Sequence, residues 1–195
     1  MTTTIAYKES AFCMPAYSNW QDVHSQVYHV AMNGEDRTGH RDFIYSVEEH
    51  RRILGDQMLV TLRSAETLPV STRPSPFTLD IGQGQRLALT VVLSRLTSVT
   101  HPDATRKRTM TQQAPYEEWF ARTMRRAGLR VEQFRFANMP LRMAHKGQTT
   151  IRLPSARFIF FAKVIDLTQF ARAWQEGIGA KRGYGFGLLE LATDD

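Results

Sequence analysis

The chain has 195 residues, of which 42% are hydrophobic and 10% aromatic, so a wholly disordered protein is excluded. Its single cysteine excludes a disulfide framework and a cysteine-based zinc site, and we expect a cytoplasmic protein with no signal peptide and no membrane span. The net charge of +6 divides into −3 over residues 1–85 and +9 over residues 86–195, which predicts that the second half binds a polyanion.

The first half predicts four strands and one clear helix. Ser18-Asn19 supplies a helix N-cap, and apolar residues then recur at helical spacing until Asn33-Gly34 ends the helix. Between residues 64 and 76 the chain is rich in Pro, Ser and Thr, so any second helix there is short. The strands are expected at residues 5–12, 42–47, 58–62 and 77–81.

The second half predicts two helices. Pro115 suits the first turn of a helix over 116–127, which Gly128 ends, and Asp166 is the expected N-cap of a helix over 167–176. A polar stretch over 94–114 is expected to be a loop. The strands are expected at residues 87–93, 131–137, 142–146, 149–153, 157–165 and 186–191.

Both halves then approximate the order β-α-β-β-α-β, once an extra hairpin at residues 142–153 is set aside. This order is typical of the ferredoxin-like unit, which RNA-recognition domains share. We therefore predict an α+β protein with tandem ferredoxin-like (RRM-like) domains, one over residues 1–84 and one over residues 85–195.

Five of the twelve glycines fall within residues 177–187, between the last predicted helix and the terminal strand. Glycine leaves no Cβ in the way of a ligand, and Lys181 and Arg182 in this segment suit a phosphate chain. A dinucleotide-binding loop is excluded, because that loop runs from strand to helix with the spacing GxGxxG, whereas this one is reversed and reads GxGxxxG. The alternative to RNA or nucleotide contact is a turn that lets the helix pack tightly on the terminal strand.

Part of this segment also fits the start of the RNA-recognition-motif signature, in the string Arg182-Gly183-Tyr184-Gly185-Phe186. Gly187 and Leu189 then depart from the signature. Only eight residues follow Gly187, too few for the helix and strand that would complete such a domain. The match therefore favours RNA contact without predicting a complete motif here.

Four strings together resemble one protein family. They are Asp22-Val23-His24-Ser25-Gln26-Val27-Tyr28-His29, Arg41-Asp42-Phe43-Ile44-Tyr45-Ser46-Val47-Glu48, Ser64-Ala65-Glu66-Thr67-Leu68-Pro69-Val70-Ser71, and residues 177–191. From about residue 18 to its end, the chain resembles the CRISPR repeat-cleaving endoribonucleases of the CasE branch, which are Cascade subunits. The glycine-rich segment is distinctive for the wider family, and the strand and Ser-Ala-x-x-x-Pro-Val-Ser strings point to this branch.

The resemblance implies an enzyme that binds a hairpin in precursor CRISPR RNA and cuts at its 3′ base without a metal or cofactor. The ribose 2′-hydroxyl would attack the adjacent phosphorus and leave a cyclic phosphate and a free 5′-hydroxyl. The product would stay bound as the guide of a type I-E or type IV effector complex. The alternative is a non-catalytic subunit that holds guide RNA, whereas a nucleotide-binding metabolic enzyme would need a carboxylate or metal constellation that the sequence lacks.

Such a reaction needs a base, an acid and positive charge near the phosphate. His24 matches the family's histidine on the first helix and can serve either proton role, although a structural histidine is the alternative. Some members carry a tyrosine three residues earlier, where this chain has Gln21. Tyr28 shares the helix face of His24 and is the second catalytic candidate, followed by Tyr17, with packing as the alternative for both.

The expected RNA-binding residues lie in three regions of the second half. The glycine-rich segment is expected to meet the RNA backbone, while the basic loop and the extra hairpin are expected to meet the stem, since A-form duplex is read chiefly by shape and phosphate. For each cation the alternative is a solvated surface charge. The predicted residues are Lys181, Arg182, Gly179, Gly183, Arg106, Lys107, Arg108, Arg142, Lys146 and Arg157.

Overall fold

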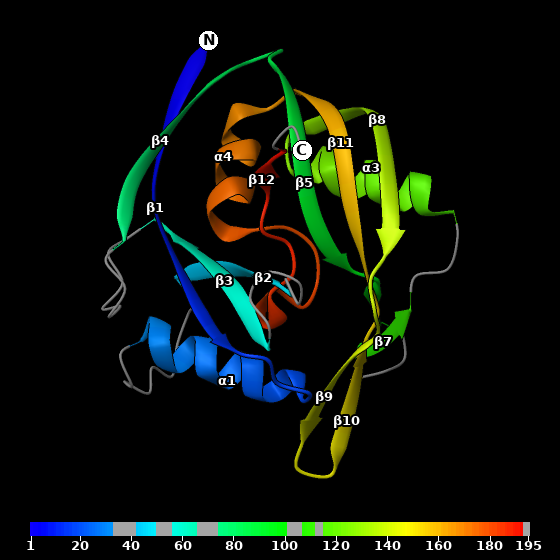
Figure 1. Cartoon of the computed structure of the whole chain (residues 1–195). Helices are drawn as coiled ribbons and strands as arrows, with labels where there is room; N and C mark the ends of the chain where they lie inside the picture. Colours follow the sequence, from blue (N-terminus) through cyan, green and yellow to red (C-terminus); the bar gives the residue numbers. More distant parts are fainter. Residues whose placement is uncertain (33–41, 50–55, 66–73, 101–106, 112–114, 193–195) are drawn as a thin grey trace.

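Two four-stranded antiparallel sheets, one from each half of the chain, form the framework of the molecule (Figure 1). The computed structural model describes residues 1–32, 42–49, 56–65, 74–100, 107–111 and 115–192. The side chains of residues 97–100 and 107–111 are not described. The segment 66–73, where the sequence allows at most a short helix, lies outside the described residues.

The first sheet has the strand order β2-β3-β1-β4. Its long strand β1 exceeds the predicted strand at both ends because it serves two partners, β3 along residues 8–15 and β4 along residues 2–9. The helix α1 begins after Asn19, whose side chain accepts a hydrogen bond from the Gln21 N–H, as the predicted N-cap requires. The elements are β1 (Thr2–Pro15), α1 (Trp20–Ala31), β2 (Phe43–Glu48), β3 (Gln57–Ser64) and β4 (Ser75–Gly82).

The second sheet has the order β12-β5-β11-β8, and two hairpins extend from it. In both sheets the first and third strands of the unit are central, which is the ferredoxin-like arrangement, so the predicted tandem fold is confirmed. The boundary after residue 84 stays a prediction. The elements are β5 (Arg86–Ser94), β6 (Leu96–Thr100), β7 (Lys107–Thr111), α3 (Tyr116–Arg126), β8 (Leu129–Asn138), β9 (Arg142–Lys146), β10 (Thr149–Leu153), β11 (Ser155–Val164), α4 (Leu167–Glu176), the 3-10 turn η1 (Arg182–Tyr184) and β12 (Glu190–Leu191).

Two predicted elements differ from the structure. The expected polar loop over 94–114 contains the hairpin β6–β7, so Lys107 and Arg108 belong to a strand rather than a loop. Arg106 lies outside the described residues. The terminal strand is limited to Glu190–Leu191 instead of 186–191, because Gly187 has a φ of 91°, which lies outside the β region.

The described residues form two hydrophobic cores, and each core takes side chains from both halves. In the larger core α3 and α4 cover the second sheet, Phe120 stacks on Phe158 with ring centroids 4.2 Å apart, and the first sheet contributes Ile5 and Ile81. In the smaller core α1 covers the first sheet. The second half contributes Leu96, Ala144, Leu153 and Phe186 to this core. The two halves are therefore held together by shared apolar burial.

One buried cation also joins the halves. The side chain of Arg63, on β3, is 3% exposed, and its Nη2 atom lies 2.6 Å from the Glu9 carboxylate. Its Nη1 atom donates to the backbone oxygens of Trp174 and Leu189 at 3.1 and 2.7 Å. The guanidinium carbon lies 4.1 Å from the centre of the Trp174 ring. A buried charge is costly unless it is paired and hydrogen-bonded, and Arg63 meets both conditions.

Candidate active site

The glycine loop, residues 177–187, runs from the end of α4 back to the second sheet. Gly187 N–H donates to the Val92 oxygen at 2.8 Å, and Ile178 N–H donates to the Gly187 oxygen at 2.9 Å, which closes the loop at its base. A Cβ on Gly187 would lie 2.0 Å from the Ile178 oxygen, and one on Gly185 would lie 2.9 Å from the Tyr45 ring. These two glycines are explained by close packing, as the alternative interpretation of the segment expected.

The tip of the glycine loop, at η1, is bonded to the first half of the chain. Trp20 Nε1 on α1 donates to the Tyr184 oxygen at 2.8 Å, and the Tyr45 hydroxyl on β2 donates to the Gly183 oxygen at 2.6 Å. Lys181, just before the turn, has a φ of 60°, a conformation that costs about 1–2 kcal/mol for a non-glycine residue. The surrounding bonds therefore hold the tip in one conformation against α1.

His24 is half-buried on α1 and faces this tip. Its Nδ1 atom is hydrogen-bonded to the Gly183 backbone oxygen, the same oxygen that accepts from Tyr45. A carbonyl oxygen can only accept, so Nδ1 carries the hydrogen. In the neutral imidazole the lone pair is therefore on Nε2, and this is the nitrogen able to take up a proton.

Two tyrosine rings flank the His24 imidazole. The Tyr28 ring centroid lies 4.4 Å away, and Tyr28 also packs edge-on against Phe43 of the core at 5.0 Å. The Tyr184 ring centroid lies 5.1 Å away on the glycine loop, and its hydroxyl donates to Gln21 Oε1 at 3.0 Å. Burial raises the pKa of Tyr184, so its hydroxyl keeps its proton at neutral pH.

The hairpin β9–β10 lies against the start of α1 (Figure 1). Asn19, the N-cap of α1, accepts from the His145 N–H at 2.8 Å and donates to the His145 oxygen at 3.4 Å. Lys146 is exposed at the turn of the hairpin. The same hairpin therefore brings an exposed cation to the end of the helix that carries His24.

Arg142 on this hairpin is buried, although the sequence placed it among the RNA-binding cations. Its guanidinium carbon lies 4.0 Å from the Trp20 ring centre and 5.7 Å from that of Phe186, and its Nη2 is 3.7 Å from Glu49. Burial lowers its pKa to about 10, so the side chain stays charged at neutral pH. Its contacts tie the hairpin to α1 and the glycine loop, and we assign it a structural role.

Arg182, at the tip of the glycine loop, donates hydrogen bonds to the last carbonyls of α4 and also lines a groove. Its Nη1 atom donates to the oxygens of Glu176 and Gly177 at 2.9 and 3.3 Å, where the helix leaves carbonyls without helical partners. It also lines a groove of about 800 Å³ between α3 and α4, together with Arg126 and Arg172. Three arginines thus line one groove beside the loop.

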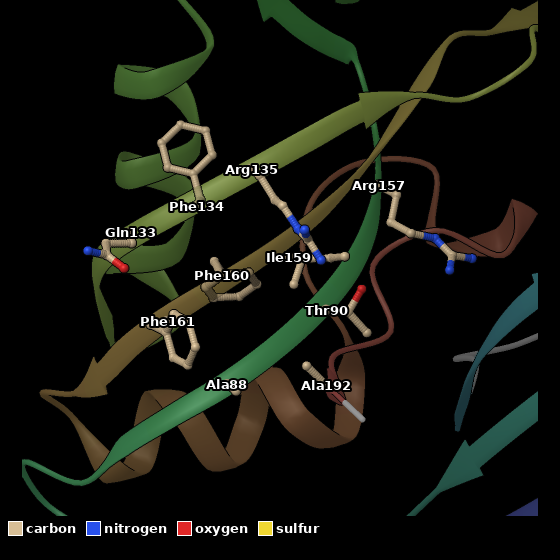
Figure 2. Close-up of a pocket in the computed structure, with 10 residues that line it drawn as sticks. All are labelled: Ala88, Thr90, Gln133, Phe134, Arg135, Arg157, Ile159, Phe160, Phe161 and Ala192. Atoms are coloured by element: carbon tan, nitrogen blue, oxygen red, sulfur yellow. The ribbon is translucent and has the colours of Figure 1, made fainter. Parts of the chain in front are cut away.

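A separate hollow of about 570 Å³ lies on the open face of the second sheet (Figure 2). Figure 2 shows Arg135 on β8 and Arg157 on β11 beside the small side chains of its floor. Arg157 is ion-paired with Glu48 at 2.8 Å. Among the described residues of its lining there is no histidine, tyrosine or carboxylate side chain, in contrast to the surroundings of His24.

Comparison with known protein families and structures identifies the family of this chain. A family described as CRISPR associated protein matches residues 6–193. The chain belongs to this family. No curated protein sequence is significantly similar to it. Within the described residues no helix is long and apolar enough to cross a membrane, and no three His, Cys, Asp or Glu side chains gather as a metal site.

Several solved structures share the fold of this chain. Cas6e from Escherichia coli K-12 is 18% identical, with a TM-score of 0.69, over 96% of this chain and 100% of that one. Cse3 from Thermus thermophilus, bound to an RNA representing a pre-cleavage complex, is 17% identical, with a TM-score of 0.70, over 96% and 99%. A chain of a CRISPR RNA-guided surveillance complex is 20% identical, with a TM-score of 0.64, over 96% and 100%. The resemblance to the CasE branch is thus confirmed in family and fold.

The structure brings together only some of the predicted site residues. His24, Tyr28 and Gly183 meet at one place, and Tyr17 packs beside the core that α1 covers. Gly179 is exposed on the glycine loop. Tyr184 was considered in the sequence only as part of the glycine-rich signature, and its contact with His24 bridges 160 residues of chain. The sequence offered one signal for Tyr184: a phenol, which can transfer a proton, lies in a motif that was expected to contact RNA.

Proposed function

We propose that the chain is an endoribonuclease that binds the hairpin of a CRISPR repeat RNA and cleaves at its 3′ base without a metal. The observation that supports this best is the Nδ1 hydrogen bond of His24, which leaves Nε2 as the basic nitrogen. Family membership and the shared fold with proteins named Cas6e and Cse3, some of them bound to RNA, agree with this substrate.

In the proposed reaction His24 Nε2 takes the proton of the ribose 2′-hydroxyl. The 2′-oxygen forms a bond to the adjacent phosphorus while the bond from phosphorus to the 5′-oxygen breaks, giving a cyclic phosphate and a 5′-hydroxyl. The Gly183 oxygen accepts from Nδ1 throughout and stabilises the imidazolium that forms. The leaving 5′-oxygen must also receive a proton, for which a second group is needed.

Tyr28, the second predicted catalytic residue, supports His24 through its ring in this proposal. The ring lies between the imidazole and Phe43, which restricts the orientation of His24. Its hydroxyl forms no hydrogen bond with the described part of the chain. Packing of the ring, rather than proton transfer by the hydroxyl, is therefore the role that the contacts favour.

The RNA-binding surface proposed here runs from the hairpin β9–β10 across the glycine loop. In this proposal Lys146, Lys181 and Arg182 meet phosphates. The groove that Arg182 shares with Arg126 and Arg172 adds positive charge, although Glu176 in the same groove is ion-paired with Arg172. Lys107 and Arg108 would add charge from β7, and Arg157 from the open sheet face. The surplus of +9 over residues 86–195 agrees with this location.

We also propose that the protein keeps its product and joins an effector complex of type I-E or type IV. A fold shared with a chain of an RNA-guided surveillance complex supports this partner.

The test is cleavage of a labelled hairpin repeat RNA in excess EDTA by wild type, His24→Ala and His29→Ala. His29 is an exposed histidine in the last turn of the same helix, so it is a matched control. We expect wild type and His29→Ala to cut at the same rate and His24→Ala to be slower by about 10²–10⁴-fold. An RNA with one 2′-deoxy sugar at the cut should bind but stay intact.

Other results would change the proposal in distinct ways. Cleavage of the 2′-deoxy RNA, or a requirement for added metal, would contradict the ribose-attack mechanism. Equal rates for His24→Ala and wild type would remove His24 from the mechanism. Tight binding by wild type without any cut would identify a subunit that only holds guide RNA, the alternative that Gln21 at the family's tyrosine position leaves open.

A further inference from the structure

The glycine loop places the phenol of Tyr184 beside His24, which lies on α1. In relatives that carry a tyrosine three residues before the histidine, both groups come from one helix, whereas this chain has Gln21 there. Gln21 and His24 are three residues apart and share a face of α1. Tyr184 lies over that face, with its hydroxyl on Gln21 and its ring beside His24.

Three hydrogen bonds fix the position of this phenol. The Gly183 oxygen accepts from His24, the Tyr184 oxygen accepts from Trp20 Nε1 at 2.8 Å, and the Tyr184 hydroxyl donates to Gln21 at 3.0 Å. All three partners lie on the first two turns of α1. The backbone and the side chain of Tyr184 are therefore held in register with the imidazole, as a preorganised catalytic group must be.

We propose that Tyr184 is the proton donor to the leaving 5′-oxygen, taking the place of the tyrosine that Gln21 replaces. This inference rests on the proposed ribonuclease function. His24 Nε2 takes the 2′-hydroxyl proton, the bond from phosphorus to the 5′-oxygen breaks, and that oxygen takes the proton of the Tyr184 hydroxyl. The imidazolium and the phenolate then exchange a proton through solvent, which restores both groups.

The surroundings of Tyr184 suit a donor. Because burial raises its pKa, the group is protonated throughout the neutral range in which His24 can act as a base. Gln21 orients the hydroxyl through a carbonyl oxygen, a neutral acceptor that a substrate oxygen can replace without leaving a buried charge. Tyr28 lacks such an orienting partner in the described part of the chain.

A sulfur substitution separates proton donation from packing. In an RNA whose 5′-oxygen at the cut is replaced by sulfur, the leaving group is a thiolate, which departs without a proton because a thiol is far more acidic than an alcohol. Single-turnover rates would be measured on ordinary and 5′-thio hairpins for wild type, Tyr184→Phe and His24→Ala. Tyr116→Phe, on α3, is the matched control, since it removes a phenol hydroxyl away from His24.

We expect Tyr184→Phe to be slower than wild type by about 10²-fold or more on ordinary RNA and to match wild type on the 5′-thio RNA. His24→Ala should be slow on both, because the 2′-hydroxyl still needs a base, and Tyr116→Phe should match wild type on both. Equal slowing of Tyr184→Phe on the two substrates would show a packing role and overturn the inference. A normal rate on ordinary RNA would overturn it as well.

Binding of the uncleavable 2′-deoxy RNA reports whether Tyr184→Phe is folded. If that variant does not bind, Gln21→Leu replaces it, because this change removes the hydroxyl's partner without altering the glycine loop. It should be slowed on ordinary RNA and rescued by the 5′-thio substitution; slowing without rescue overturns the inference. Failure of wild type to cut either substrate would instead contradict the proposed function itself.

Discussion

Tyr28 and Tyr184 contact the same imidazole, yet their hydroxyls differ in environment. Tyr28 offers His24 only its ring, which also contacts Phe43. We expect Tyr28→Phe to cleave RNA as wild type does, and Tyr28→Ala to lose activity and about 3 kcal/mol of stability, because a supporting ring is removed. Single-turnover cleavage and urea unfolding would measure both. Loss of activity in Tyr28→Phe would return Tyr28 to the proton-transfer role that the sequence suggested.

The pKa of Glu190 is raised in the folded protein, whereas the pKa of a carboxylate that stabilises the fold is lowered. Burial, followed by repulsion from Glu48, raises its pKa in the folded protein, so the folded protein binds this proton more readily than the unfolded chain. Stability therefore falls as the pH rises from the ordinary pKa of 4.5 through the raised one. We expect Glu190→Gln to raise the melting temperature at neutral pH and to lose this advantage below pH 4.5. A gain of equal size at every pH would contradict the assignment.

At the scale of elements, the glycine loop depends on close approach of backbone to backbone. A Cβ on Gly187 would lie 2.0 Å from the Ile178 oxygen, whereas a Cβ on Gly147, also at positive φ, would meet nothing within 4 Å. We expect Gly147→Ala to cost about 1 kcal/mol for its conformation and Gly187→Ala about 3 kcal/mol or more, because strain and steric clash add. Urea unfolding of the two variants compares these costs. Equal losses would mean that the loop can move away from the added methyl group.

Elements with local signals were predicted well from the sequence. Asn19 and Asp166 are the caps that their side-chain chemistry predicted, and both accept from the backbone of the following turn. The hairpin β6–β7 was missed because its residues are polar and show no apolar alternation. Phe186 to Leu189 are apolar and buried, yet they form part of a loop and not a strand, because Gly187 among them has a positive φ.

Contacts between segments that are distant in the sequence could not be predicted from sequence patterns. Arg142 lies in a basic region and was predicted to be exposed, but the rings that cover it, Trp20 and Phe186, come from opposite ends of the chain. The place of Tyr184 beside His24 depends in the same way on the docking of the glycine loop on α1. His24 itself was found through family strings, since a lone helical histidine has no pattern of its own.

At the scale of the whole molecule, Arg63 and the shared cores make the two sheets one cooperative unit. We expect Arg63→Ala to cost about 3–5 kcal/mol, because the change leaves Glu9 and two carbonyls without their buried partner. Arg86→Ala, which breaks an exposed pair with Glu132, should cost less than about 1 kcal/mol. Urea unfolding should show one transition for all three proteins. Two separated transitions in wild type would mean that the halves unfold independently.

The bonds of Asn19 to both α1 and His145 have a consequence for the accuracy of processing. Under the proposed function the hairpin β9–β10 grips an RNA stem and α1 carries the catalytic base. Asn19 bonds the two elements and Arg142 packs on Trp20, so the distance between grip and chemistry is held constant. In that proposal the arrangement would act as a molecular ruler, which sets the cleavage point by its distance from the stem and not by the bases there. Guides of uniform length would then follow from the rigidity of this junction, whatever sequence lies at the cut.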